Sequence, residues 1–245
     1  MRFLVPVGIV IALLVVGVGF IVGGAEDEPV GVTATTGASV EVEDERQERF
    51  AAFVLDDAQA TWRMLFARAG KRYEDAKLVL YRDETEAACG FGKVATGPFY
   101  CPTDDRVSVD LSFHEELARP AQAYVLAHEI GHHVQDLLGA TATVKIFRRS
   151  QREGEPGANV RLELQADCYA GVWAHTTQKR GLLEEGDVDE ALRAAAALGA
   201  DRRTGGRVSP ETFTHGTSDQ RRRWFKAGFE HGAVDSCDTF SASGL

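Results

Sequence analysis

The longest apolar run in the chain lies near its start and carries no charged residue. The 23 residues from Phe3 to Ala25 would, as a helix rising about 1.5 Å per residue, cross a hydrocarbon core of about 30 Å. Arg2 precedes the run and acidic residues 26–28 follow it, which predicts a cytoplasmic start and an external carboxy-terminal domain. A cleaved signal peptide is the alternative, since Gly23 and Ala25 are small residues that a signal peptidase favours. We prefer an uncleaved transmembrane anchor, because the run exceeds the usual signal-peptide core of about 7–15 residues.

Apolar periodicity begins only after a segment of mixed composition that follows residues 1–25. Residues 26–42 combine Gly, Thr, Ala and acidic side chains without a bulky apolar repeat, which predicts a flexible spacer. Over residues 44–69 apolar side chains recur at helical spacing. Two short runs, 77–82 and 106–112, are rich in β-forming residues, whereas the glycine-bearing stretch between them looks like a loop. A small sheet beside a long helix is therefore expected.

Helical patterns dominate the second half of the chain. A helix is expected over residues 120–138, because proline suits the first turn of a helix and Gly139 can stop one. A second helix is expected at about 158–178. With the small sheet, these patterns predict a helix-dominated α+β domain over residues 43–245.

Two capping-box signatures mark the starts of further helices. Asp187 with Glu190 opens an alanine-rich helix, and Thr217 with Gln220 precedes an aromatic stripe that fits a core. The basic run 221–223 within that last helix is interpreted as a solvated helix face.

Composition and charge exclude one class of partner. Hydrophobic residues make up 44% of the chain and charged residues 26%, which allows a sizeable core. The formal net charge is −10 and the isoelectric point is near 5.2. Because phosphate binding needs a concentrated cationic face, nucleic acid is not expected as a partner.

The four cysteines fit an exported domain. An even number of cysteines outside the cytoplasm predicts disulfides, and four cysteines allow three connectivities. We favour Cys89 with Cys101 across a short glycine-rich loop, and Cys168 with Cys237, which would tie the carboxy-terminal tail to a core helix. Spacing alone does not decide between the connectivities.

One short motif carries the chemistry. His128 and His132 are four residues apart in the predicted helix, so both imidazoles lie on one face and can share a divalent cation. Glu129 is rotated about 100° from His128, which lets its carboxylate flank the cation and act as a general base on water. Gly131 leaves room beside this site. The helical context argues against chance occurrence of the motif.

A catalytic zinc takes three protein ligands and leaves one position for water or substrate. Glu163 is the best candidate for the third ligand. Asp167 follows it by four residues on the same predicted helix face. From there Asp167 can accept a hydrogen bond from the outer nitrogen of His128 or His132 and so fix the orientation of that ring. Two ordinary surface acids are the alternative interpretation.

Blocks of sequence around these residues match one known family. The stretch Ala121–Gln135 holds the first motif, and Arg161–His175 holds Glu163 and Asp167. With these blocks the chain resembles the bacterial neutral zinc metallopeptidases. The resemblance runs from about Phe50 to Phe240 and includes further blocks at Tyr100–Pro102, Val107–Phe113, Phe213–Thr217, Gln220–Arg221 and Cys237.

The resemblance implies a zincin-like fold and a single zinc ion. The ion would be ligated here by His128, His132 and Glu163, with Glu129 as the catalytic acid/base. The implied reaction is hydrolysis of a bond in a peptide or protein substrate. In that reaction zinc lowers the pKa of its water toward about 7, and Glu129 passes the proton to the leaving amine.

Two further features concern the substrate. His215, in a loop before a helix start, is the candidate for stabilising the oxyanion, with Tyr124 behind it. A structural hydrogen-bonding role is the alternative for His215. Strand residues 107–111 could present an edge to which an extended peptide adds. The other histidines lack partners at ligand spacing and are expected to have ordinary surface or core roles: His114, His133, His175 and His231.

These inferences predict a single-pass membrane protein that is anchored through residues 3–25 and has its catalytic domain outside the cytoplasm. The main rival is a non-catalytic envelope module in which the metal only stabilises the domain. A weaker rival is an amidase that acts on a non-protein amide by the same water chemistry. The sequence does not indicate the oligomeric state or the cleavage preference.

Overall fold

The fold is known from a computed structural model that describes most of the chain after the predicted spacer. The described residues are 36–82, 84–93, 97–140, 143–144, 146, 157–199 and 215–245. The predicted membrane segment, residues 3–25, lies outside them. Within the described ranges, no helix is both long and apolar enough to cross a membrane.

The first helix, α1 (Thr36–Arg68), begins earlier than the sequence suggested. Residues 36–42 were expected to end the flexible spacer but belong to this helix instead. Ion pairs at helical spacing, such as Arg49 with Glu45 at 3.1 Å, support its early turns. Further along, the fully buried Trp62 packs edge-on against Tyr169, with ring centroids 5.1 Å apart. This contact joins α1 to the helical core.

Three strands form the sheet, in the order β1-β5-β4. β1 (Lys77–Tyr81) runs parallel to β5 (Arg106–Asp110), and β4 (Phe99–Cys101) runs antiparallel to β5. A separate hairpin joins β2 (Glu84–Ala87) to β3 (Gly90–Lys93). The stretch expected as a loop thus contains three strands. Because β5 pairs on both sides, the prediction that residues 107–111 offer a free strand edge was wrong.

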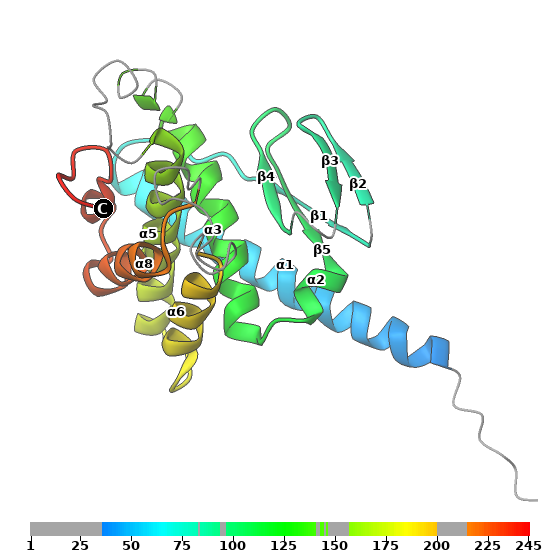
Figure 1. The fold of residues 1–245 in the computed structure, drawn as a ribbon. Helices are drawn as coiled ribbons and strands as arrows, with labels where there is room; N and C mark the ends of the chain where they lie inside the picture. Colours follow the sequence, from blue (N-terminus) through cyan, green and yellow to red (C-terminus); the bar gives the residue numbers. More distant parts are fainter. Residues whose placement is uncertain are drawn as a thin grey trace, which may run out of the picture. The chain divides into compact units, whose positions relative to one another are not determined.

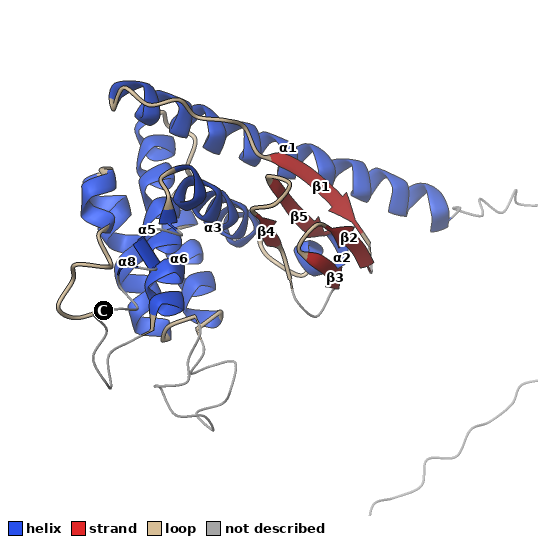
Figure 2. Ribbon diagram, turned by 90° about the horizontal axis from the view of Figure 1, so that it is seen from above, coloured by secondary structure: helices blue, strands red, loops and turns tan. Residues whose placement is uncertain are grey.

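The helices of the second half confirm the helix-dominated α+β class. Figures 1 and 2 show α3 between two groups of elements, with the sheet on one side and the helices α5, α6 and α8 on the other. The elements are α2 (Leu111–Glu115), α3 (Arg119–Leu137), α5 (Ala158–Lys179), α6 (Asp187–Ala197), α8 (Ser218–His231) and a 3-10 turn, η3 (Val234–Cys237).

After α1, most of the predicted helix ends are confirmed, and one predicted cap is not. α3 has Pro120 in its first turn, and Gly139, with φ of 83°, follows its end. Thr217 and Gln220 form the predicted capping box on α8. In contrast, α6 is capped by Gly186, and the carboxylate of Asp187 accepts from the backbone N–H of Glu184 at 2.8 Å. The predicted Asp187 capping box is therefore absent.

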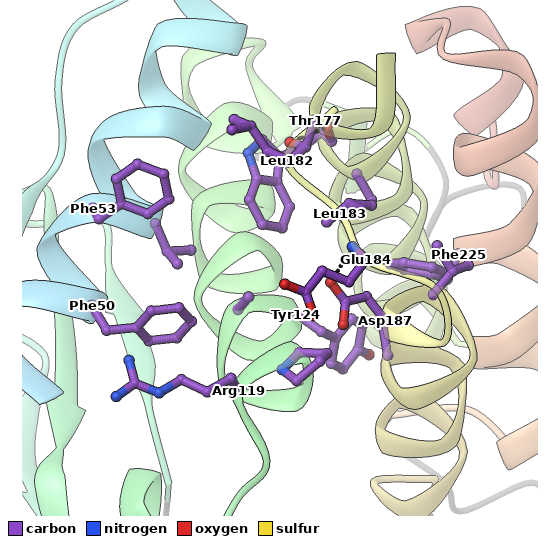
Figure 3. A pocket seen from close by; sticks show the side chains of 17 residues that line it. Phe50, Phe53, Arg119, Tyr124, Thr177, Leu182, Leu183, Glu184, Asp187 and Phe225 are labelled. Carbon is purple, nitrogen blue, oxygen red and sulfur yellow. Dashed lines mark hydrogen bonds between the residues drawn. The ribbon is translucent and has the colours of Figure 1, made fainter. Parts of the chain in front are cut away.

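Close helix contacts and two disulfides fix the relative positions of the core elements. A Cβ on Gly171 would overlap the backbone of α8, and a Cβ on Gly228 would overlap the backbone of α5, so the two helices touch at these glycines. The disulfides are Cys89–Cys101 and Cys168–Cys237, which are the pairings that the sequence favoured. The helices also leave an open hollow of about 390 Å³ between α1, α3, α5 and α6 (Figure 3).

Candidate metal centre

The two motif histidines lie one turn apart on the same face of α3. Their ring centroids are 4.7 Å apart. His128 is buried and His132 is half-buried, so the face that they share borders an accessible space. The four-residue spacing therefore places both imidazoles on one face of the helix, as the sequence predicted.

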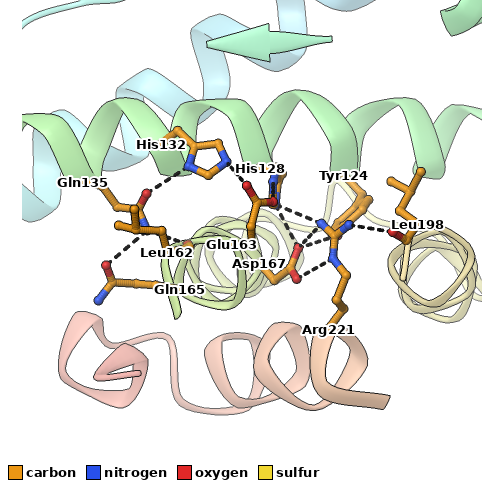
Figure 4. Close-up of polar contacts among 10 residues, drawn as sticks. All are labelled: Tyr124, His128, His132, Gln135, Leu162, Glu163, Gln165, Asp167, Leu198 and Arg221. Carbon is orange, nitrogen blue, oxygen red and sulfur yellow. Dashed lines mark hydrogen bonds and ion pairs between the residues drawn. The ribbon is translucent and has the colours of Figure 1, made fainter. Parts of the chain in front are cut away.

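Glu163 on α5 completes a group of three side chains that could hold a metal ion (Figure 4). One of its carboxylate oxygens is 3.3 Å from Nε2 of His128, and the other is 3.6 Å from Nε2 of His132. One ligand atom from each residue lies within 4.8 Å of the other two. This donor set, two imidazole nitrogens and one carboxylate oxygen, suits a catalytic zinc with one open position.

Gly131 lets α5 approach α3 closely enough to bring Glu163 to the histidines. A Cβ at this position would lie 2.8 Å from the carbonyl oxygen of Ala166 and 2.9 Å from its Cα. Such distances are shorter than ordinary van der Waals contact, so any larger residue would push the helices apart. The missing side chain thus serves helix packing as well as leaving room beside the site.

Acceptors outside the cluster orient both rings. Nδ1 of His128 lies 2.8 Å from a carboxylate oxygen of Asp167. Nδ1 of His132 lies 2.9 Å from the side-chain oxygen of Gln135, which in turn donates to the carbonyl of Leu162 at 2.7 Å. Because these oxygens accept, each Nδ1 can donate to them, and in the neutral form of each ring, which is the form that binds a metal, Nε2 faces Glu163 with its lone pair. Asp167 therefore occupies the position that the sequence predicted for it.

Arg221 on α8 reaches the same network, contrary to expectation. It was predicted to lie on a solvated helix face, but it is 3% exposed. It donates to both carboxylate oxygens of Asp167 at 2.8 Å and to the hydroxyl of Tyr124 at 3.0 Å. Its neighbours Arg222 and Arg223 are exposed, as predicted. The available sequence signal was that Arg221 precedes the core residue Phe225 by four, on the same face of the helix.

The charges in this network stabilise one another. Burial alone would raise the pKa of Asp167, but Arg221 and His128 outweigh it and hold that pKa below its usual range. Burial alone would lower the pKa of His128, yet the nearby carboxylates raise it to about 10. Burial would also raise the pKa of Glu163, which His132 and His128 lower instead. Both acids are therefore carboxylates at neutral pH.

Glu129 lies beside the metal-binding residues without joining them. It is buried, with 7% of its surface exposed, and it lines the same cavity as His128, His132 and Glu163. Burial raises the pKa of its carboxyl, the positive charge of the two histidines lowers it, and Glu163 raises it further, for a net upward shift. A backbone hydrogen bond with Tyr100 helps to fix the side chain. This contact with β4 was not predicted.

The cavity of about 320 Å³ in front of the cluster contains the other predicted site residue. His215 lines it, together with Phe99 and Tyr100 of β4. The charge of His215 is close enough to lower the pKa of Glu163. The hydroxyl of Tyr124 lies deeper, where it contacts Asp167 at 2.5 Å. The structure thus brings together all six predicted site residues: His128, Glu129, His132, Glu163, Asp167 and His215.

The remaining histidines occupy core or surface positions. His133 is fully buried and contacts the carbonyl of Glu74 at 2.6 Å and the hydroxyl of Tyr100 at 3.0 Å. His175 contacts the carbonyl of Phe229 at 2.7 Å. His114 is buried and His231 is exposed. None of these four belongs to a group of metal-binding side chains among the described residues.

Comparison with known proteins agrees with this geometry. The "Uncharacterized protein YpfJ" of Escherichia coli (strain K12) is 41% identical over 251 residues, which cover 96% of this chain and 87% of that protein. The "Uncharacterized protein Rv2575" of Mycobacterium tuberculosis (strain ATCC 25618 / H37Rv) is 40% identical over 213 residues, which cover 78% and 69%. No solved structure matches the chain. Residues 3–240 match the family described as "Putative neutral zinc metallopeptidase", and the chain therefore belongs to that family.

Proposed function

We propose that this chain is a zinc-dependent peptidase of zincin-like design that hydrolyses peptide bonds in peptide or protein substrates. The observation that carries the proposal is the convergence of three ligand atoms, from His128, His132 and Glu163, within 4.8 Å of one another at an open cavity. These residues would hold one zinc ion. When bound, zinc lowers the pKa of water toward about 7 and polarises a carbonyl group.

Glu129 is the acid/base in this proposal. Its carboxylate lies in the same cavity as the metal-binding residues and is buried. An upward shift of its pKa brings a carboxyl closer to the operating pH, where a group can both accept and return a proton. We assign to Glu129 the transfer of a proton from the attacking water to the leaving amine.

His215 is the proposed donor to the oxyanion that develops on the scissile carbonyl. It lines the cavity from the loop before α8. Tyr124 fits this role less well, because its hydroxyl already contacts Asp167 and Arg221. We therefore assign Tyr124 to the support of Asp167.

The substrate is proposed to lie along β4. This strand is at the end of the three-stranded sheet in the described residues, and Phe99 and Tyr100 line the metal cavity. An extended peptide that adds to a strand edge is recognised mainly through its backbone, which tolerates varied side chains. The sequence assigned peptide binding to residues 107–111, and we now assign it to β4, which pairs with that strand.

We also propose that the domain works outside the cytoplasmic membrane, on a single anchor of residues 3–25. The pairing of all four cysteines in disulfides supports an oxidising compartment. The uncharged run itself supports the anchor.

The test is cleavage of an unstructured protein by the full chain, with and without a metal chelator. The Glu129→Gln variant should retain zinc and lose about 10²–10⁴-fold in turnover, because general acid–base catalysis contributes about that much. Glu116→Gln, at an exposed position, is the matched control and should keep full activity. Cleavage that neither the chelator nor Glu129→Gln reduces would refute the peptidase. A zinc-loaded chain without any cleavage would favour the non-catalytic module.

A further inference from the structure

The hollow between α1, α3, α5 and α6, hereafter the groove, is a second candidate binding site, separate from the metal cavity. Its volume is about 390 Å³, within the range of ligand-binding pockets. Its walls come from the helices α1, α3, α5, α6 and α8 and from the loop before α6, and most of the side chains in them are apolar or aromatic (Figure 3). The lining includes both aromatic or aliphatic and acidic side chains, among them Phe50, Phe53, Trp173, Leu182, Glu184 and Asp187.

The rim of this groove exposes large apolar side chains. Phe53 on α1 is 56% exposed, and Leu182 on the loop before α6 is 49% exposed. Among the described residues, only Met64 and Ile146 are further exposed hydrophobics of this size. An apolar hollow with exposed apolar side chains on two of its walls marks a binding surface, because burial of those side chains would be favourable.

The charges at the groove favour a cationic partner. Glu184 and Asp187 both line it, and their side chains lie side by side in Figure 3. Neither carboxylate pairs with a cationic side chain in the described part of the protein. The cation at the other side of the groove, Arg119, already lies over the ring of Phe50, 4.4 Å from its centroid. The groove therefore suits apolar groups next to a positive charge.

One side chain separates the groove from the metal cavity. Tyr124 lines both spaces. Its ring packs edge-on against Phe225 with centroids 5.6 Å apart, while its hydroxyl contacts Asp167. The groove and the metal cavity are therefore neighbours that share one buried side chain.

We propose that this groove is a docking site for the protein substrate, and that it binds a segment in which apolar side chains stand next to a lysine or arginine. The inference rests on the proposed peptidase function, because a peptidase substrate is the polypeptide that the neighbouring metal cavity would hold. The groove would add a preference for particular side chains. The strand edge of β4 cannot supply one, because it would bind mainly the backbone of the substrate. Phe53 and Leu182 contact the apolar side chains, and Glu184 with Asp187 attracts the cation.

The test is binding of a short fluorescent peptide of Leu, Phe and one Lys to the full chain with Glu129→Gln, held in lipid nanodiscs. Peptide with Glu in place of Lys, and peptide with Ser in place of Leu and Phe, should bind more weakly. Phe53→Ala and Leu182→Ala should each weaken binding by about tenfold, as expected for loss of a buried apolar side chain. Joint Glu184→Gln and Asp187→Asn should weaken it about threefold and abolish the preference for Lys.

Matched variants show whether the groove itself is responsible. Met64→Ala removes an exposed apolar side chain of α1 outside the groove, and Glu185→Gln removes an exposed acid beside it. Both should leave the peptide affinity unchanged. Equal affinity for all three peptides, or equal effects of the groove and control variants, would overturn the inference. Binding of dodecylammonium without binding of the peptide would also overturn it.

One competing occupant belongs to the chain itself. A photoreactive phenylalanine analogue at position 53 should cross-link to the bound peptide. Cross-linking to residues 3–25 instead would mean that the chain fills its own groove, and would overturn the inference. The binding test uses a chain with Glu129→Gln, so its outcome does not depend on turnover. If the wild-type chain shows no peptidase activity, the proposed function is refuted, but the binding result is unchanged.

Discussion

The guanidinium of Arg221 donates hydrogen bonds of 2.8 Å to both carboxylate oxygens of Asp167. Both side chains are almost fully buried, at 3% and 0% exposure. A lone buried carboxylate would tend to take up a proton, so the arginine keeps Asp167 ionised. Asp167 can then accept a hydrogen bond from His128, which is 2.8 Å away. A residue on α8 thus helps to orient His128, a proposed metal ligand on α3.

Arg221→Gln should destabilise the folded chain by about 3–5 kcal/mol, because it removes the cationic partner of a buried carboxylate, which must then either stay uncompensated or take up a proton. Urea unfolding measures the change. Arg222→Gln, at the exposed neighbouring position, should alter stability by less than about 0.5 kcal/mol. If the two variants are equally stable, the buried ion pair does not support the fold as described.

Asp167→Asn should lower zinc affinity by about 10–100-fold, since the outer acceptor of a metal-binding histidine contributes about that much. Competition with a chelator of known affinity measures it. Asp219→Asn changes an exposed acid on α8 and should leave zinc affinity unaltered. Unchanged affinity in Asp167→Asn would show that His128 does not depend on this hydrogen bond.

Gly131→Ala should separate α3 from α5, because the added Cβ would lie 2.8 Å from the carbonyl oxygen of Ala166. We expect a loss of about 1–3 kcal/mol in unfolding free energy, as for overpacked cores, together with weaker zinc binding as Glu163 moves away from the histidines. Gly157→Ala is the control, since its Cβ would meet open space. Weak zinc binding in the control as well would mean that the close helix contact is not the cause.

The sequence predicts those parts of the site that depend on residues close together in the chain, and it fails where residues far apart in the chain interact. The metal-binding set follows from local spacing, because His128 and His132, and likewise Glu163 and Asp167, are four apart on helices with recognisable ends. Arg221 was misassigned because a basic run normally faces solvent. Only the buried charge of Asp167, far away in the sequence, explains why the first arginine of the run faces inward.

The sheet shows the same limit. The runs that became β1 and β5 are rich in β-forming residues, so both were predicted. β4 has only three residues, Phe99–Cys101, too few for a period-two pattern to be recognised. It exists because it pairs with β5 and because Cys101 is tied to Cys89. Without β4, the sequence left β5 as the free edge, and the contact between Tyr100 and Glu129 could not be anticipated.

Acid should destabilise the fold through His114, which is fully buried. Burial, with the charge of Arg119, lowers the pKa of its imidazole from 6.5 to about 4. Above pH 6.5 the ring is neutral in folded and unfolded chains, so it has no effect. Between pH 6.5 and about 4 only the unfolded chain gains the proton, so stability falls as the pH falls, by about 1.4 kcal/mol per unit at most.

His114→Leu removes this proton uptake. Urea unfolding at about pH 7.5 and about pH 4.5 should therefore show a smaller loss of stability in the variant than in the wild type, by roughly 2 kcal/mol. The other titrating groups are common to both chains and cancel in the difference. Equal losses in the two chains would contradict a buried, neutral His114.

Zinc K-edge X-ray absorption of the purified full chain tests the central claim most directly, because it reports the atoms around the ion. The account predicts two imidazole nitrogens and carboxylate or water oxygen at about 2.0–2.2 Å, with no sulfur at about 2.3 Å. A sulfur ligand, or a shell with fewer than two imidazoles, would contradict the site formed by His128, His132 and Glu163.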